Sequence, residues 1–233
     1  MCNLYSVTKG QQAIREAFRA MTDHTGNLPP LPGIFPDQMA PVVRHGVDGR
    51  ELAMLRWGFP CPPNIPGNRP VTNIRNVSSS YWRAWMTPAH RCLVPVTAFC
   101  EYTAGKLAVP TWFALNPDRP LFAFAGLWRP WTGTRGTKAH PVEGEHHLFA
   151  FLTCPPNAVV EPVHPKAMPV ILTTEAECDA WMTASVPDAL TLQRSLPDGL
   201  LKIVAQGEKQ DPPALVHSTD PGRDGPRAQA ATR

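Results

Sequence analysis

Two apolar runs, Leu121-Phe122-Ala123-Phe124-Ala125-Gly126 and His147-Leu148-Phe149-Ala150-Phe151-Leu152-Thr153, carry the strongest structural signal in the chain. A strand that is buried on both faces reads as a continuous apolar run of roughly four to eight residues, whereas a half-exposed strand alternates. Both runs are too apolar to alternate cleanly, so we expect two buried strands. Residues 129–145 between them are rich in Gly, Thr and charged residues and predict an exposed excursion.

Similar strand-like runs lie on both sides of this pair, at residues 39–44, 51–57, 91–96, 99–103, 111–115, 168–172 and 200–204. The turn-rich segment 45–50 predicts a hairpin between the first two of these runs. The 28 prolines favour many short strands and ordered loops, because proline interrupts both ladders and helix interiors. In segment 23–37 the prolines and a glycine exclude a paired strand and predict a loop, and residues 61–70 also read as irregular.

Helices are expected to be short. Residues 9–21 form an amphipathic pattern that a Thr8/Gln11 capping box opens, with Met21 on the apolar face. Further helices are expected to start at 78–80 and to span 174–182 and 188–195. The pattern predicts an α+β fold with one domain over residues 2–206, dominated by antiparallel strands that close into a barrel with flanking short helices. Residues 207–233 lack apolar periodicity and predict a disordered tail.

Composition bounds the class of protein. The chain has 233 residues, 43% of them hydrophobic, which is sufficient for a sizeable core. No apolar run approaches the roughly 18 residues that a membrane helix needs, and the start has no signal-peptide pattern, so we expect a soluble, cytoplasmic protein. Six cysteines form no CxxC pair, which favours reduced thiols and no zinc site. The net charge of +3 permits an anionic partner.

Cys2, the second residue of the chain, could be unusually reactive. A small second residue permits removal of Met1, which would place an α-amine and a thiol on one carbon skeleton. The two groups ordinarily titrate near roughly 7.7–8.0 and 8.5, so modest tuning supplies both nucleophiles at neutral pH. An aldehyde would react with the amine to an imine, and the thiol could then close a five-membered thiazolidine. The alternative is that Cys2 is a small hydrophobic residue at a frayed terminus.

Three further residues could serve such chemistry. Glu101 is a charge within an apolar strand, where burial would raise its pKa, although an exposed strand-edge carboxylate is an equal alternative. His164 precedes a buried strand and could be a general acid or base, although any of the eight histidines can be a surface residue. Asn73 could hold the terminal amine or be a turn residue, and Arg75 would share its side in extended chain and bind phosphate.

Aromatic residues and arginines are interleaved over residues 73–91. Such a mixture can stack bases and hold phosphates, while core burial is the commoner role for Trp82 or Trp85. A set of ordered motifs resembles the SRAP (SOS response-associated peptidase-like) family: 1–6 (Met-Cys-Asn-Leu-Tyr-Ser), Trp57-Gly58-x-Pro60, Asn73-x-Arg75, 91–95 (Arg-Cys-Leu-Val-Pro), Phe99-x-Glu101-Tyr102, 125–128 (Ala-Gly-Leu-Trp) and His164-x-x-x-Met168-Pro169-Val170.

This resemblance implies an abasic-site processing protein that binds single-stranded DNA. The sequence itself shows no metal site and no nucleotide-cofactor loop, so we expect no cofactor. Cys2 would form a thiazolidine DNA–protein crosslink with the open-chain sugar aldehyde. Asn73 would position the nucleophile, Glu101 would be the acid/base, and His164 would assist ring opening, crosslink reversal and lyase chemistry. The DNA path would be lined by Trp57, Gly58 and Arg75. We also expect a monomer that is nucleoid-associated when bound to DNA.

The chain departs from the family pattern in places. Asn3-Leu4 stands where many relatives have Gly-Arg, so we expect Arg83 or Arg91 to supply the missing phosphate contact. Two other functions stay open. One is a cysteine peptidase, in its mildest form only autoproteolytic, with Cys2 as thiolate and His164 as base. The other is a non-catalytic module that binds single-stranded DNA by stacking.

Overall fold

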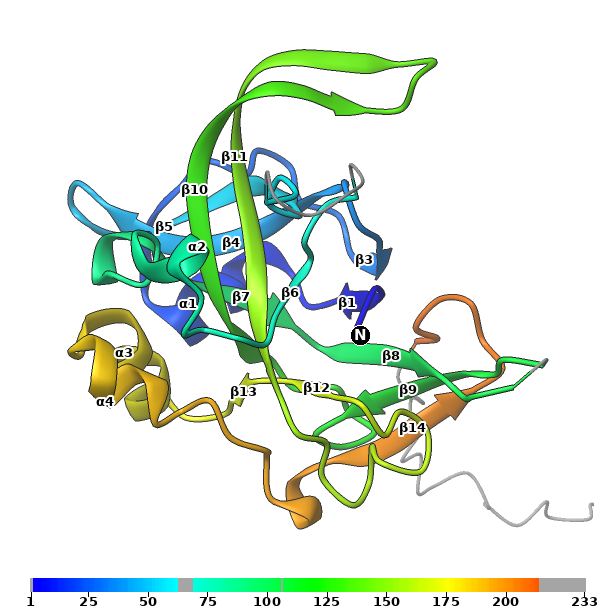
Figure 1. Cartoon of the computed structure of the whole chain (residues 1–233). Helices are drawn as coiled ribbons and strands as arrows, with labels where there is room; N and C mark the ends of the chain where they lie inside the picture. The colour runs from blue at the N-terminus through cyan, green and yellow to red at the C-terminus, as the bar shows by residue number, and fades with distance from the viewer. Residues whose placement is uncertain (1, 63–68, 106, 214–233) are drawn as a thin grey trace, which may run out of the picture.

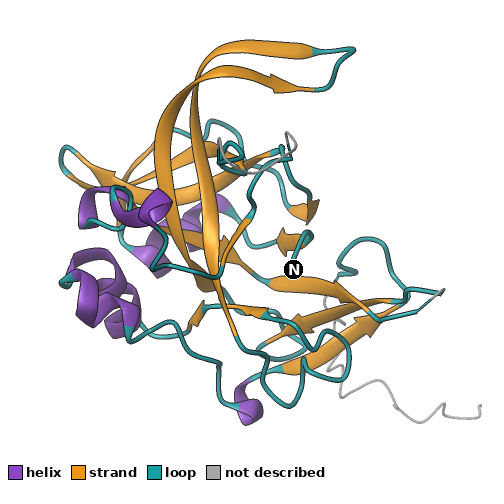
Figure 2. Ribbon diagram, viewed as in Figure 1, coloured by secondary structure: helices purple, strands orange, loops and turns teal. Residues whose placement is uncertain are grey.

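The computed structural model describes residues 2–62, 69–105 and 107–213. Within these ranges the fold is a single strand-dominated domain, as the sequence predicts. Short α-helices lie mostly to one side of the strands (Figure 2). The helices and strands pack around one large hydrophobic core, with a small second cluster around Leu4 and Trp112.

A closed barrel forms the centre of the domain. Its strands are β4 (Met39–Gly46), β5 (Gly49–Trp57), β7 (Arg91–Val96), β10 (Phe122–Gly136) and β11 (Pro141–Cys154). The hydrogen-bonded order is β11-β10-β7-β4-β5, and β11 also pairs in parallel with β5, which closes the ring (Figure 1). The two apolar runs lie in β10 and β11 and are buried throughout 122–127 and 148–153, because they face the core on one side and other elements on the other.

A second sheet lies beside the barrel and carries the N-terminal strand. Its order is β14-β9-β8-β1-β3. The strands are β1 (Tyr5–Val7), β3 (Leu31–Ile34), β8 (Ala98–Tyr102), β9 (Pro110–Ala114) and β14 (Lys202–Gln206). β3 corrects the expectation of a loop over 23–37. It pairs with β1 at the sheet edge, where Pro32 is tolerated because an edge strand needs ladder donors on one side only.

The remaining elements are short. The strands are β2 (Ala20–Asp23), β6 (Asn73–Ile74), β12 (Met168–Pro169) and β13 (Ile171–Leu172). The helices are α1 (Gln11–Phe18), α2 (Ser80–Arg83), α3 (Glu175–Thr183) and α4 (Val186–Leu190), with 3-10 turns η1 (Pro88–His90) and η2 (Asp198–Leu200).

The helix boundaries differ partly from the expectation. α1 has no side-chain cap, since Thr8 contacts Thr97 instead of capping the helix. It ends at Phe18 because Arg19 adopts φ 55°, and Met21 is 67% exposed in β2. The capping box that forms is at α3, where Thr174 accepts from the Glu177 amide and the Glu177 carboxylate accepts from the Thr174 amide. α4 starts before the expected 188–195 range.

Segment 129–145 is largely exposed, as expected, but it does not interrupt the two strands. β10 and β11 continue through it as a long antiparallel hairpin that projects from the barrel (Figure 1). The Arg135 guanidinium holds the hairpin to the turn before β4 by an ion pair with Asp37 (2.8 Å) and donates to the Gly58 carbonyl (2.9 Å). Most residues between these anchors and the tip are exposed, which explains the polar composition.

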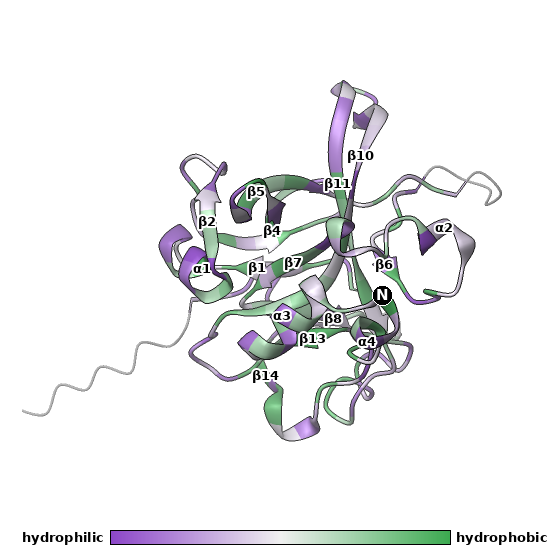
Figure 3. Ribbon diagram, turned by 90° about the vertical axis from the view of Figure 1, so that its left-hand side faces the viewer, coloured by the Kyte–Doolittle hydropathy of each residue, from purple (hydrophilic) through white to green (hydrophobic). Residues whose placement is uncertain are grey.

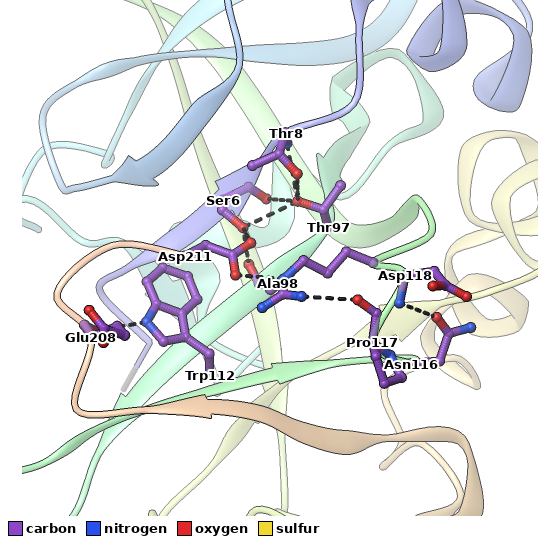
Figure 4. Close-up of polar contacts among 11 residues, drawn as sticks. Ser6, Thr8, Thr97, Ala98, Trp112, Asn116, Pro117, Asp118, Glu208 and Asp211 are labelled. Atoms are coloured by element: carbon purple, nitrogen blue, oxygen red, sulfur yellow. Dashed lines mark hydrogen bonds and ion pairs between the residues drawn. The ribbon is translucent and has the colours of Figure 1, made fainter. Parts of the chain in front are cut away.

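The chain after β14 packs against the domain as far as the description reaches. We call residues 207–213 the C-terminal strap. Asp211 is buried and pairs with the buried Arg119 guanidinium (2.7 Å), and its second carboxylate oxygen accepts from the Ser6 hydroxyl (2.7 Å; Figure 4). The Asp211 amide donates to the Pro32 carbonyl (2.8 Å). The prediction of a disordered tail from residue 207 is therefore wrong for residues 207–213. The rest of the predicted tail, residues 214–233, lies outside the described ranges.

Candidate active site around Cys2

Strand pairing brings together the four predicted catalytic residues from distant parts of the chain. Cys2 lies three positions before the start of β1, which pairs with β8, the strand that contains Glu101. Asn73 opens β6, which runs parallel to β11 opposite Phe151. His164 lies in the turn-rich connection from β11 to β12. The sequence identifies these residues by type, and only the sheet order explains their proximity.

Asn73 fixes the backbone of the N-terminal segment. Its side-chain amide nitrogen donates to the Cys2 carbonyl (2.8 Å) and to the Thr72 hydroxyl oxygen (2.8 Å). The Thr72 hydroxyl in turn donates to the side-chain oxygen of Asn3 (3.1 Å). Thr72 is a site residue that the sequence reasoning missed, although its place beside Asn73 in a polar pair before an apolar residue was a usable signal.

Glu101 and His164 form a carboxyl–imidazole pair. Glu101 Oε2 lies 3.8 Å from His164 Nδ1, with side-chain exposures of 4% and 18%. Burial raises the pKa of Glu101 to about 7, because charging a carboxyl away from water is costly. Burial lowers the pKa of His164 for the same reason. Near neutral pH the carboxyl therefore exchanges its proton readily beside a neutral imidazole, as an acid/base pair requires.

The Cys2 thiol is 1% exposed, and its Sγ–H donates to the Leu4 carbonyl at 3.5 Å. Burial raises the pKa of this thiol well above its ordinary value, and the charge of Glu101 raises it further. Cys2 is therefore an ordered part of the core and not a frayed end. A standing thiolate is disfavoured, so the thiol needs a base at the moment of reaction.

Two hydrogen-bond acceptors in the site have no donor in the described part of the chain. Asn73 Oδ1 and Glu101 Oε1 are buried and have no hydrogen-bond partner among the described residues. A buried acceptor without a donor costs free energy, so such atoms often face a ligand or a reacting group. Both oxygens belong to residues that act on Cys2, by hydrogen bond or by charge.

Trp57 and Gly58 do not line an open DNA path, which corrects the expectation. Trp57 is fully buried, stacks on Phe151 at 5.3 Å between ring centroids, and donates its Nε1–H to the Thr72 carbonyl (3.1 Å). It supports Thr72 from within the barrel. Gly58 is also buried, and its φ of 120° together with Pro70 explains the glycine, since an added Cβ would lie 2.5 Å from Pro70 Cβ.

The arginines divide into buried and exposed. Arg91 is fully buried and donates to the carbonyls of Met86 (2.8 Å), Trp181 (2.9 Å) and Ala184 (2.8 Å). It ties α3 to the barrel, so the expectation that it contacts phosphate is wrong. Arg75 and Arg83 are exposed, and the Arg75 guanidinium binds the Lys166 carbonyl.

The described ranges contain no group of three or more His, Cys, Asp or Glu side chains that could hold a metal ion. Five thiols, those of Cys2, Cys92, Cys100, Cys154 and Cys178, are buried and unoxidised. No helix in the described part of the chain is long and apolar enough to cross a membrane.

The fold and the site together define the class of protein. It is a barrel-centred domain in which a cysteine near the N-terminus lies beside an asparagine and a carboxyl–imidazole pair. The chain belongs to the SOS response associated peptidase (SRAP) family, whose model matches residues 1–205. It is 28% identical to abasic site processing protein YoqW of Bacillus subtilis over 178 residues, 73% of this chain and 75% of the relative. Against YobE, an abasic site processing protein of the same organism, the identity is 27% over 177 residues, 73% of this chain and 76% of the relative.

Solved structures support the fold. A crystal structure of a protein from Bordetella bronchiseptica matches with a TM-score of 0.68 at 23% identity, covering 88% of this chain and 98% of the other. A protein from Bacteroides thetaiotaomicron matches with a TM-score of 0.68 at 20% identity, covering 86% and 90%. The C-terminal strap follows the part of the chain that the family model matches.

Proposed function

We propose that this protein binds single-stranded DNA and captures abasic sites through Cys2 after removal of Met1. The observation that carries the proposal is the setting of Cys2: Asn73 holds its carbonyl, and Glu101, with a pKa of about 7, lies beside it. The names of YoqW and YobE, abasic site processing proteins, support the same substrate. The aldehyde of an abasic site is a suitable electrophile for the amine and thiol of Cys2, and the adjacent phosphodiester is a suitable ligand for the exposed arginines.

The chemistry balances as a condensation. The free α-amine of Cys2 adds to the C1′ aldehyde of the ring-opened deoxyribose and gives a carbinolamine. The Glu101 carboxyl protonates the carbinolamine hydroxyl, which leaves as water and produces an iminium ion. The resulting Glu101 carboxylate accepts the thiol proton while Cys2 Sγ adds to C1′. The products are one thiazolidine and one water, and Glu101 ends protonated, as it began.

His164 serves the steps before and after capture. A neutral imidazole can accept the proton of the C1′ hydroxyl as the sugar ring opens, and it can return that proton to the ring oxygen. Its side chain is 18% exposed, which leaves it accessible to a bound strand. The same imidazole can abstract the C2′ proton of an iminium, the step that leads to strand scission by a lyase route. Reversal of the crosslink uses these transfers in the opposite order.

Exposed arginines supply the electrostatic part of binding. Arg75 and Arg83 lie on the chain segment that follows Asn73, and both are suited to phosphate contacts. Loss of one such contact should reduce the salt dependence of binding by about one counterion. A monomer is sufficient for the whole reaction, because every proposed group comes from one chain.

A denaturing gel tests the proposal. Protein with Met1 removed, as verified by mass, is incubated with a single-stranded oligonucleotide that contains one abasic site. We expect a shifted covalent band that Cys2→Ala abolishes. Cys2→Ser retains the amine and should lose the stable crosslink while imine-dependent strand cleavage survives. A stable crosslink at the wild-type level in Cys2→Ser, or in protein that retains Met1, would contradict the thiazolidine mechanism.

Two variants separate the proton-transfer roles. Glu101→Gln should slow capture, and His164→Ala should impair reversal and strand scission more than capture. Equal effects on every step would refute this division. Cleavage of a general peptide substrate by the wild-type protein would instead support a cysteine peptidase, which the raised pKa of the Cys2 thiol disfavours. Intact DNA binding without any covalent band would indicate a non-catalytic module.

A further inference from the structure

A cavity of about 430 Å³ lies between the segment that leads into α2 and the helix α4. Its apolar lining comes from the side chains of Val77, Met86, Val186 and Leu190. Ser78, Ser79 and Arg83 supply the polar part of the lining. Small-molecule sites commonly measure about 300–1,000 Å³, so this volume suits one planar group with a substituent.

Local contacts hold the cavity in shape. Met86, 3% exposed, belongs to the main core. The Ser79 hydroxyl oxygen caps α2 by accepting from the Tyr81 amide (3.4 Å). The Ser78 hydroxyl donates to the side-chain oxygen of Asn76 (2.6 Å), which leaves its lone pairs able to accept from a ligand. The cavity is therefore preformed and presents an acceptor beside an apolar wall.

Arg83 determines the charge of the occupant. Its side chain is exposed at the last turn of α2, and its guanidinium has no hydrogen bond or ion pair with any described residue. A cation without a partner at the lining of an apolar cavity fits a ligand that joins an apolar planar group to an anion. A nucleotide has both parts in one unit, a base with apolar faces and a phosphate.

The cavity lies close to the reaction site along the chain. Ser78 is five positions after Asn73, so their Cα atoms are at most about 17 Å apart even in extended chain. That span corresponds to at most about five stacked nucleotides. β6, α2 and α4 lie on the same side of the molecule (Figure 3), and the exposed Arg75 lies between Asn73 and the cavity along the chain.

We propose that this cavity holds one base of the single strand whose abasic deoxyribose reacts at Cys2, with a phosphate of that nucleotide bound by Arg83. The inference rests on the proposed function for the identity of the strand. It adds a subsite that would position the strand at a fixed distance from Cys2. The base lies against Val186 and Leu190 of α4, and its amino or imino edge faces the Ser78 oxygen.

The wild-type protein can be tested without any substitution. Binding is measured with oligonucleotides that contain one tetrahydrofuran residue, an abasic analogue with no aldehyde, so no covalent step interferes. In a series, one further base at a time is removed at each of the five nearest positions on either side. We expect one position to lose about tenfold in affinity, since a bound base contributes on the order of 1–3 kcal/mol. Equal, small losses at every position would overturn the proposal.

Filling the cavity provides the matched test. In Leu190→Phe the added ring occupies the space of the base, so removal of the base at the sensitive position should no longer matter. Val47→Phe is the control, because Val47 is 99% exposed in the β4–β5 turn. Thermal unfolding identifies any variant that fails to fold. If Leu190→Phe fails to fold, Val186→Phe replaces it, because its added ring fills the same space. Full base sensitivity in a folded, filled variant would overturn the subsite.

The parallel crosslinking assay separates this proposal from the function on which it rests. A covalent band with no position-dependent base effect would support the abasic-site function and refute the subsite. A position-dependent base effect with no covalent band would support the subsite and refute the covalent function. Arg83→Gln should weaken every oligonucleotide alike and lower the salt slope by about one. An unchanged slope would contradict the phosphate contact.

Discussion

Substitution of Glu101 by glutamine tests the acid/base assignment through protein stability, independently of any DNA. Burial raises the pKa of Glu101 from its ordinary value of 4.5 to about 7. The folded protein therefore holds this proton more tightly than the unfolded chain does. The contribution of Glu101 to stability is fully present below about pH 4.5 and is lost as pH rises through about 7.

The magnitude follows from that interval. Each pH unit is worth about 1.4 kcal/mol, so charging Glu101 in the folded state lowers the free energy of unfolding by about 3 kcal/mol. Glutamine has nearly the same shape and never ionises. Glu101→Gln should therefore match the wild type within about 1 kcal/mol near pH 5 and exceed it by about 3 kcal/mol at pH 8.

The assay is urea unfolding at several values between about pH 5 and about pH 8 at constant ionic strength. Glu161→Gln is the matched control, because Glu161 is exposed on the same connection as His164 and should leave the wild-type curve unchanged. A difference between Glu101→Gln and wild type that stays constant with pH would refute the reasoning. Glu101 would then be an ordinary carboxylate, and its role as the proton donor in capture would lose its physical basis.

Three further substitutions test the framework. Asp211→Ala leaves Arg119 buried without its carboxylate and should lower the free energy of unfolding by about 3–5 kcal/mol, and an unchanged urea midpoint would show that the strap is not anchored. Gly58→Ala forces a Cβ against Pro70 at positive φ and should cost about 1–3 kcal/mol in the same measurement, with no loss as the contrary result. Arg91→Met removes the donor to three carbonyls and should lower thermal stability by several degrees while the salt slope of DNA binding is unchanged. A reduced slope would restore Arg91 as a phosphate contact.

Local pattern was sufficient for most of the secondary structure. The runs that contain Phe124 and Phe149 were identifiable as buried strands because their apolar content exceeds what a half-exposed strand has. The helix over 174–182 was predicted, although the capping box of Thr174 and Glu177 that opens it was not. The Thr8 capping box has the same spacing and did not form, since Thr97, far away in sequence, binds Thr8 instead.

The sequence by itself determined the residue types of the site and the ordered motifs that place the chain in its family. Tertiary structure decided which arginine is exposed and which lies in the core. The local pattern puts Arg83 near a short helix and Arg91 at the start of a strand, and neither setting determines the burial of the guanidinium. The same holds for the pairing of β11 with β5 that closes the barrel, and for the burial of Asp211. Propensity and periodicity depend on neighbours in sequence, whereas burial, raised pKa values and partner choice depend on neighbours in space.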